Sequence, residues 1–185
     1  MPLTLTGEQV ERLRALVRSD TPDGFEQFYE LIHNREMPRH ARVWIDFVYD
    51  EWNGLNRDVM AEAFRGSTKT TTFTNDFLAY QIGLHPERDN IIIQSSDESA
   101  NDNSQAVKDM IDHNPAWKLL FPEIVADETR GWGEGGYYVK RLDPDGGEAG
   151  YGEWVRQASK FPTFVGYSVT SASIVGRHPT GLMIL

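Results

Sequence analysis

The chain has 185 residues, of which 39% are hydrophobic and 25% charged, the size and composition of one soluble globular domain. The absence of cysteine excludes a disulfide scaffold, a thiol nucleophile and a zinc site built on thiolates. A formal net charge of −10 repels a polyanion at long range, so any DNA contact must be local. The best basic cluster for such a contact is Arg35, Arg39, His40 and Arg42, whose alternative interpretation is a solvated helix surface.

Residues 1–57 are predicted to form a helical amino-terminal segment. Thr6 and Gln9 have the spacing of a capping box, which indicates a first helix. Thr21 followed by Pro22 is a second start signal, because proline is favoured at the first helical position. An apolar stripe at helical spacing, which indicates a third helix, comprises Val43, Trp44, Phe47 and Val48.

Residues 58–185 alternate between strand-like and helical patterns. Strands are predicted at 58–64, 90–94, 164–169 and 181–185, and helices at 70–82 and from Ser96 to about residue 114. A glycine-rich insertion near 131–152 contains residues 137–141 and a turn at 143–147, after which residues 153–156 could pair back on 137–141 as a hairpin. The predicted fold class is therefore α/β, a P-loop NTPase-like parallel sheet with flanking helices, preceded by the helical amino-terminal segment.

The strongest chemical signal lies between the predicted strand 58–64 and the predicted helix 70–82. The first N–H groups of a helix are unpaired and its dipole is positive there, so a phosphate chain is stabilised. The predicted ATP-binding residues are Arg65, Gly66, Ser67, Thr68, Lys69, Thr70 and Thr71. Lys69 would reach the outer phosphates and Thr70 would bind Mg²⁺ through its hydroxyl.

This phosphate loop, residues 65–71, departs from the common P-loop pattern. That pattern has glycine directly before the lysine and again six residues before it, where this chain has Thr68 and Ala63. An alternative interpretation of the loop is a polar turn that caps the next helix. The predicted strand before it, the predicted helix after it and the strand at 90–94 favour a nucleotide-binding α/β domain.

In this departure the chain resembles large terminase subunits, the viral DNA-packaging ATPases. Their deviant phosphate loop carries an arginine four residues before the lysine, as Arg65 stands before Lys69. The resemblance continues through residues 90–96, 114–115, 121–122 and 175–180, and it covers roughly the last two thirds of the chain. It implies ATP and Mg²⁺ as cofactors, and catalytic roles for Arg65 at the γ-phosphate and for Lys69.

The resemblance implies an ATPase that packages double-stranded DNA into a procapsid. Implied partners are double-stranded DNA, the portal protein, the small terminase subunit and further copies in a ring, and no membrane. The implied location is the host cytoplasm and, transiently, the procapsid portal. The two alternatives are a helicase-like nucleic-acid translocase and a nucleotide-binding assembly module that does not hydrolyse ATP.

Two further expectations follow from the resemblance. In the family the last apolar strand leads into two acidic residues, whereas this sequence stops at Leu185. We therefore expect a truncated ATPase core at 58–185 that lacks the acidic catalytic pair and is inactive by itself. The family's adenine contacts come from the segment before the loop, which makes His40, Arg42 and Trp44 candidates. An alternative interpretation of Trp44 is a position in the protein core, because tryptophan is usually largely buried.

Overall fold

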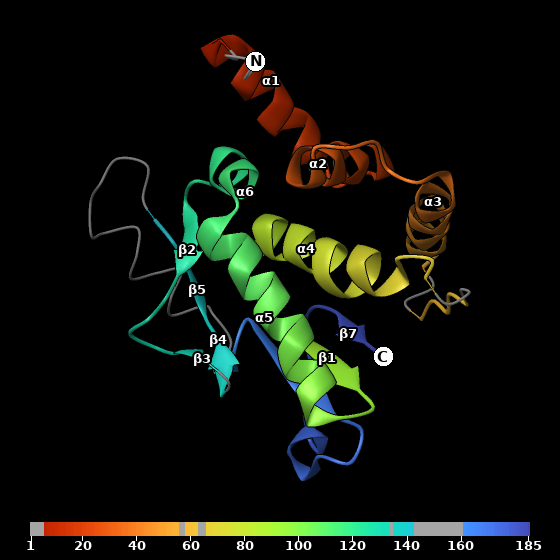
Figure 1. The fold of residues 1–185 in the computed structure, drawn as a ribbon, viewed down its shortest axis with the longest axis vertical. Helices are drawn as coiled ribbons and strands as arrows, with labels where there is room; N and C mark the ends of the chain where they lie inside the picture. Colours follow the sequence, from red (N-terminus) through yellow and green to blue (C-terminus); the bar gives the residue numbers. More distant parts are fainter. Residues whose placement is uncertain (1–5, 56–57, 63–65, 134, 143–160) are drawn as a thin grey trace. The chain divides into compact units, whose positions relative to one another are not determined.

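The computed structural model describes residues 6–55, 58–62, 66–133, 135–142 and 161–185 (Figure 1). Its contacts divide the chain into two compact units, Met1–Thr72 and Phe73–Leu185, called here the amino-terminal and carboxyl-terminal units. The described part of the phosphate loop thus groups with the amino-terminal helices. The division predicted after residue 57 stays a prediction.

The amino-terminal unit is built on three helices, as predicted: α1 (Gly7–Val17), α2 (Pro22–His33) and α3 (Arg39–Asn53). The Thr6 hydroxyl and the Gln9 side chain form the expected reciprocal capping box. Thr21 caps α2 by accepting a hydrogen bond from the N–H of Gly24. These caps satisfy N–H groups that have no partner inside the helix, which explains where both helices begin.

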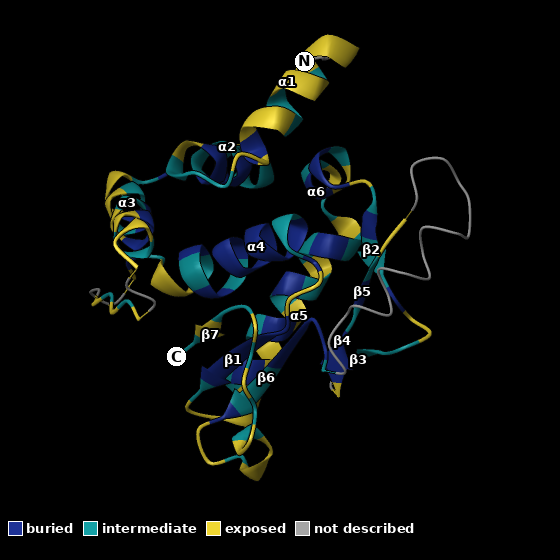
Figure 2. Cartoon of the chain, turned by 180° about the vertical axis from the view of Figure 1, so that it is seen from behind, coloured by how far each residue is buried: buried dark blue, intermediate teal, exposed yellow. Residues whose placement is uncertain are grey.

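The core of this unit lies between α2 and α3. Phe25, Phe28 and Tyr29 of α2 are fully buried, and so are Ala41 and Ile45 of α3. The predicted stripe on α3 was wrong in part, because Val43 and Phe47 are exposed and only Val48 of that set is buried (Figure 2). The buried face of α3 instead comprises Ala41, Ile45, Val48 and Tyr49.

The carboxyl-terminal unit is mixed α/β. A π-helical turn, η1 (Thr70–Phe77), starts in the amino-terminal unit and runs directly into α4 (Leu78–Leu84). Strand β1 (Asn90–Gln94) matches the predicted strand, and α5 (Asp97–His113) follows, with Ser96 accepting from the N–H of Ser99 as its cap. The short helix α6 (Pro115–Leu120) comes next.

The main sheet of the described residues has the order β3-β4-β6-β1-β7. Strand β1 is parallel to β6 (Phe164–Ser168) and to β7 (Met183–Ile184), as predicted. The edge is antiparallel, formed by β3 (Trp132–Gly133) and β4 (Gly136–Tyr137). A separate antiparallel pair joins β2 (Ile124–Ala126) to β5 (Val139–Arg141). The sheet is therefore mixed rather than wholly parallel.

Helix α5 packs closely on the sheet. Its residues Ala100, Val107 and Ile111 are buried, and they face the apolar strands β1 and β6 (Figure 2). Gly166 in β6 makes this packing possible, because a Cβ there would lie 2.6 Å from the carbonyl oxygen of Ala100. The α5 and sheet layers form the rigid part of this unit.

One predicted strand was wrong over its described length. Residues 58–62 form neither strand nor helix, and the last two residues of the predicted strand, together with the hairpin segment 153–156, lie outside the described residues. Glycine-rich residues 131–136 contribute to the edge strands β3 and β4. No helix in the described ranges is long and apolar enough to cross a membrane.

Candidate nucleotide-binding loop

The phosphate loop adopts an unusual backbone. Gly66 and Thr68 both have left-handed φ angles, 84° and 64°. Such a φ is rare for a β-branched residue, and it costs on the order of 1–3 kcal/mol unless the surroundings impose it. A residue of negative φ followed by a left-handed one, as at Ser67 and Thr68, is the alternation that turns successive N–H groups toward an anion.

A helix begins directly after the loop. The N–H of Thr72 donates to the carbonyl oxygen of Thr68 at 2.8 Å, which closes the first turn. η1 then starts at Thr70 with the wider π-helical winding, a form that is rare and concentrated at functional sites. The predicted juxtaposition of loop and helix start is therefore present, although residues 58–62 before it do not form a strand.

Three hydroxyl groups in and beside the loop are buried without a hydrogen-bond partner among the described residues. They are the side-chain oxygens of Ser67, Thr68 and Thr72. Ser67 is 2% exposed and Thr72 0% exposed, so water does not readily satisfy them. A buried hydroxyl without a partner costs about 1–3 kcal/mol, which makes a cluster of three hard to explain by folding alone.

The remaining loop residues lie at the surface. Gly66, Lys69 and Thr70 are exposed, and Thr71 is half-buried. Within the described ranges, Lys69 has no ion-pair partner, so its ammonium group is available to a phosphate. Arg65, the predicted γ-phosphate residue, lies outside the described residues.

Helix α3 supports the loop from within the same unit. His40 Nε2 lies 2.9 Å from the carbonyl oxygen of Ser67, and this hydrogen bond joins residues 27 positions apart. The imidazole also packs edge-on against Trp44, with ring centroids 5.0 Å apart. Trp44 is half-buried, so it is neither a full core residue nor an open stacking surface.

The guanidinium group of Arg42 is paired with acidic side chains. It binds Asp46 at 2.8 Å and Asp23 at 2.6 Å, and it also pairs with Glu26. Burial disfavours the charge, but these hydrogen bonds and the attraction of the carboxylates outweigh burial and raise the pKa of Arg42 above its ordinary value. The structure therefore gives Arg42 a role in joining α2 to α3, and it does not leave the guanidinium free for adenine.

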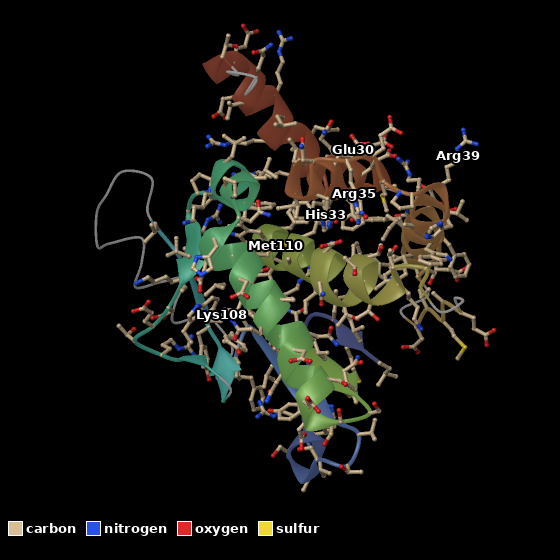
Figure 3. The ribbon with its side chains drawn as sticks, viewed as in Figure 1. Glu30, His33, Arg35, Arg39, Lys108 and Met110 are labelled. Atoms are coloured by element: carbon tan, nitrogen blue, oxygen red, sulfur yellow. The ribbon has the colours of Figure 1, made fainter. Side chains whose placement is uncertain are left out.

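The other arginines of the predicted basic cluster, Arg35 and Arg39, have different surroundings. Arg35 donates to the Tyr29 hydroxyl at 3.0 Å and lies over that ring. Arg39 is exposed and projects away from α3 (Figure 3). With Arg42 neutralised by three carboxylates and His40 directed at the loop, the four residues do not make one continuous basic surface.

The hydroxyls of the loop are not used as those of a simple helix cap are. A polar turn that only caps a helix uses its hydroxyls on the helix N–H groups, as Thr6, Thr21 and Ser96 do here. Ser67 and Thr68 do not, and a phosphate chain supplies the acceptor oxygens that these hydroxyls lack. Lys69 adds the matching positive charge.

The acidic residues after β1 serve the fold. Asp97 Oδ1 accepts a hydrogen bond from the N–H of Ser168 at 3.2 Å, which ties the start of α5 to the end of β6. Asp97 and Glu98 also occupy the first turn of α5, where the helix dipole favours negative charge. Among the described residues, no group of three or more histidine or acidic side chains could hold a metal ion.

Sequence reasoning missed two features of this region. Thr72 was not in the predicted set, although its place three residues after Lys69 in a run of threonines puts it on the same helical turn. The contact of His40 with Ser67 has no sequence signal, because it depends on how α3 folds back to the loop. In comparisons with known protein families, curated proteins and solved structures, nothing matches this chain.

Proposed function

We propose that the phosphate loop binds the phosphates of ATP, and that the chain is the ATP-binding part of a viral DNA-packaging ATPase. The single observation that carries the nucleotide site is the set of buried hydroxyls of Ser67, Thr68 and Thr72, which have no hydrogen-bond partner among the described residues. Beside them lies Lys69, which forms no ion pair within the same described ranges. The packaging role is supported by the resemblance of residues 65–71 and 90–96 to large terminase subunits.

The loop residues have distinct duties in this proposal. The N–H groups of residues 66–68 cradle phosphate oxygens, and the Ser67 and Thr68 hydroxyls donate to them. Lys69 neutralises the β- and γ-phosphates, which matters because charge neutralisation is a main contribution to phosphoryl transfer. The resemblance assigns Arg65 to the γ-phosphate. Mg²⁺, when bound with the nucleotide, supplies further neutralisation, and the exposed hydroxyl of Thr70 would hold it.

In the complete enzyme the proposed reaction is hydrolysis of ATP. Water attacks the γ-phosphorus, the bond to the β–γ bridging oxygen breaks, and the products are ADP and phosphate. The released free energy would drive double-stranded DNA through the portal, with the small terminase subunit and a ring of identical copies as partners. The work would take place in the host cytoplasm at the procapsid.

The test is a titration of the chain with a fluorescent ATP analogue in the presence of Mg²⁺, followed by a phosphate-release assay. Lys69→Ala is the key variant and Lys118→Ala, an exposed lysine on α6, is its matched control. We expect weak binding by the wild-type chain, at least about tenfold weaker binding by Lys69→Ala, and no change for Lys118→Ala. We expect little or no phosphate release.

Three results would contradict the proposal. Binding that Lys69→Ala leaves unchanged places the nucleotide somewhere other than this loop. A folded wild-type chain that does not bind the analogue at millimolar concentration removes the nucleotide site altogether. If Lys118→Ala weakens binding as much as Lys69→Ala, the effect reflects total charge and the loop assignment is wrong.

A further inference from the structure

We infer that His40 is a positioning residue for the phosphate loop, which it prepares for the triphosphate, rather than a residue that contacts adenine. This inference rests on the proposed function of the loop. The observation behind it is the hydrogen bond of 2.9 Å between His40 Nε2 and the carbonyl oxygen of Ser67. A carbonyl oxygen only accepts, so the imidazole nitrogen donates in this contact.

The bond fixes the orientation of one peptide group. The described peptide bonds are all trans, and in a trans peptide the C=O and the following N–H point in opposite directions. Because the Ser67 carbonyl points to His40, the N–H of Thr68 points away from α3. That N–H belongs to the left-handed residue of the loop, where an anion would be bound.

Helix α3 is a firm base for this contact. Ala41 and Ile45, which follow the exposed His40 in the helix, are both 0% exposed. Arg42 joins α3 to α2 through Asp23 and Glu26. A side chain on such a base can hold Thr68 in its costly conformation without the help of ligand, which preserves binding energy for the phosphates.

The imidazole is itself held in place. Its edge-on contact with Trp44, one helical turn later on α3, restricts the ring, and the ring nitrogen Nε2 is directed at Ser67. An adenine-contacting imidazole would need a free ring face or a free nitrogen. Here Nε2 is engaged by the loop and the ring contacts Trp44, and these two contacts favour a supporting role.

The experiment compares three variants with two ligands. His40→Ala removes the ring and the donor, His40→Phe keeps a ring that can pack on Trp44 but has no donor, and His40→Gln keeps an N–H donor at similar reach. Each chain is titrated with ATP and with inorganic tripolyphosphate, both with Mg²⁺, by calorimetry. Circular dichroism of the ligand-free chains checks that each variant is folded.

If His40 positions the loop, His40→Phe and His40→Ala bind both ligands about tenfold more weakly, and His40→Gln recovers most of the affinity. Equal losses for ATP and tripolyphosphate are required, because the loop binds only the part that they share. If His40→Ala does not fold, the comparison of His40→Phe with His40→Gln still decides, since both retain a bulky side chain.

Two outcomes overturn the inference and leave the proposed function standing. One is wild-type affinity in the folded His40→Phe variant, together with the loss caused by Lys69→Ala. The other is weaker binding of ATP with unchanged binding of tripolyphosphate, which would make His40 an adenine contact. A wild-type chain that binds neither ligand overturns the proposed function and the role of His40 with it.

Discussion

Two polar clusters in this protein use their side chains in opposite ways. At the start of β1, Asp89 and Asn90 are 4% and 2% exposed, and both are fully engaged. Asp89 Oδ1 accepts from the N–H and the hydroxyl of Thr180, while the Asn90 amide donates to Thr163 and its Oδ1 accepts from Leu182. In the phosphate loop and just after it, the equally buried hydroxyls of Ser67 and Thr72 have no partner among the described residues.

We interpret this difference as one between a structural cluster and the proposed phosphate-binding cluster. The β1 cluster joins three segments distant in sequence, and its hydrogen bonds are complete within the fold, so a ligand has nothing to add. The loop cluster keeps donors and acceptors unused at an energetic cost, which a fold tolerates chiefly where a ligand will satisfy them. Four predictions test this contrast, beginning with the largest expected effect.

The tight packing of α5 on β6 should be the most sensitive feature of the carboxyl-terminal unit. In Gly166→Ala the new Cβ meets the Ala100 carbonyl at 2.6 Å and the Ser104 hydroxyl at 2.7 Å. Backbone must move to accommodate it, so we expect a loss of about 3 kcal/mol in the free energy of unfolding, measured in urea. Gly133→Ala is the control, because no atom lies within 4 Å of its new Cβ.

An equal loss in both glycine variants would mean that the effect comes from backbone entropy or strand propensity rather than from overlap. A wild-type stability for Gly166→Ala would mean that α5 is free to shift on the sheet. In that case the carboxyl-terminal unit does not provide the rigid scaffold inferred here.

The β1 cluster should lose much of its contribution to stability when one of its residues is replaced. Asn90→Ala removes the acceptor of the Leu182 N–H and a donor to the Thr163 carbonyl, and so leaves buried backbone groups without side-chain partners. We expect a loss of about 2 kcal/mol by urea denaturation. Asn101→Ala, on the exposed face of α5, should change stability by less than about 0.5 kcal/mol. Similar losses in the two variants would contradict the structural role of Asn90.

How much of the fold the sequence predicts depends on whether the signal is local. The apolar run at 90–94 and the caps at Thr6, Thr21 and Ser96 are local signals, and each matches the structure. Strands β3 and β4 have two residues each, too few to show a periodicity, and they exist because they pair with each other and with β6.

The same distinction between local and long-range signals applies to the candidate site. The loop residues were predicted from a local pattern beside a helix start, and their role in binding a nucleotide stays a prediction. The support from His40 could not be predicted, because it depends on a contact across 27 residues. The strand expected before the loop was wrong at 58–62, which form neither strand nor helix.

A third prediction concerns Arg42, which joins helices α2 and α3 in the amino-terminal unit. Arg42→Met keeps much of the packing but leaves Asp23, Glu26 and Asp46 without their shared cation. We expect a loss of about 1 kcal/mol, which shrinks in 1 M salt because screening weakens partly exposed ion pairs. Arg12→Met, whose side chain is 79% exposed beside Glu8, should have almost no effect. A loss that salt does not reduce would point to packing rather than charge.

The smallest predicted effect bears most directly on the contrast between the clusters, because the same chemical change should have opposite signs in the two. Thr72→Val replaces a buried hydroxyl that has no partner in the described structure, so the free energy of unfolding should rise by up to about 1 kcal/mol. Thr180→Val removes the hydroxyl bound to Asp89 Oδ1 at 2.6 Å and should lower it by about 1 kcal/mol. Urea denaturation of the ligand-free chains measures both. If Thr72→Val is instead destabilising, its hydroxyl is satisfied in solution, the loop cluster is complete like the β1 cluster, and the main structural support for a phosphate site is lost.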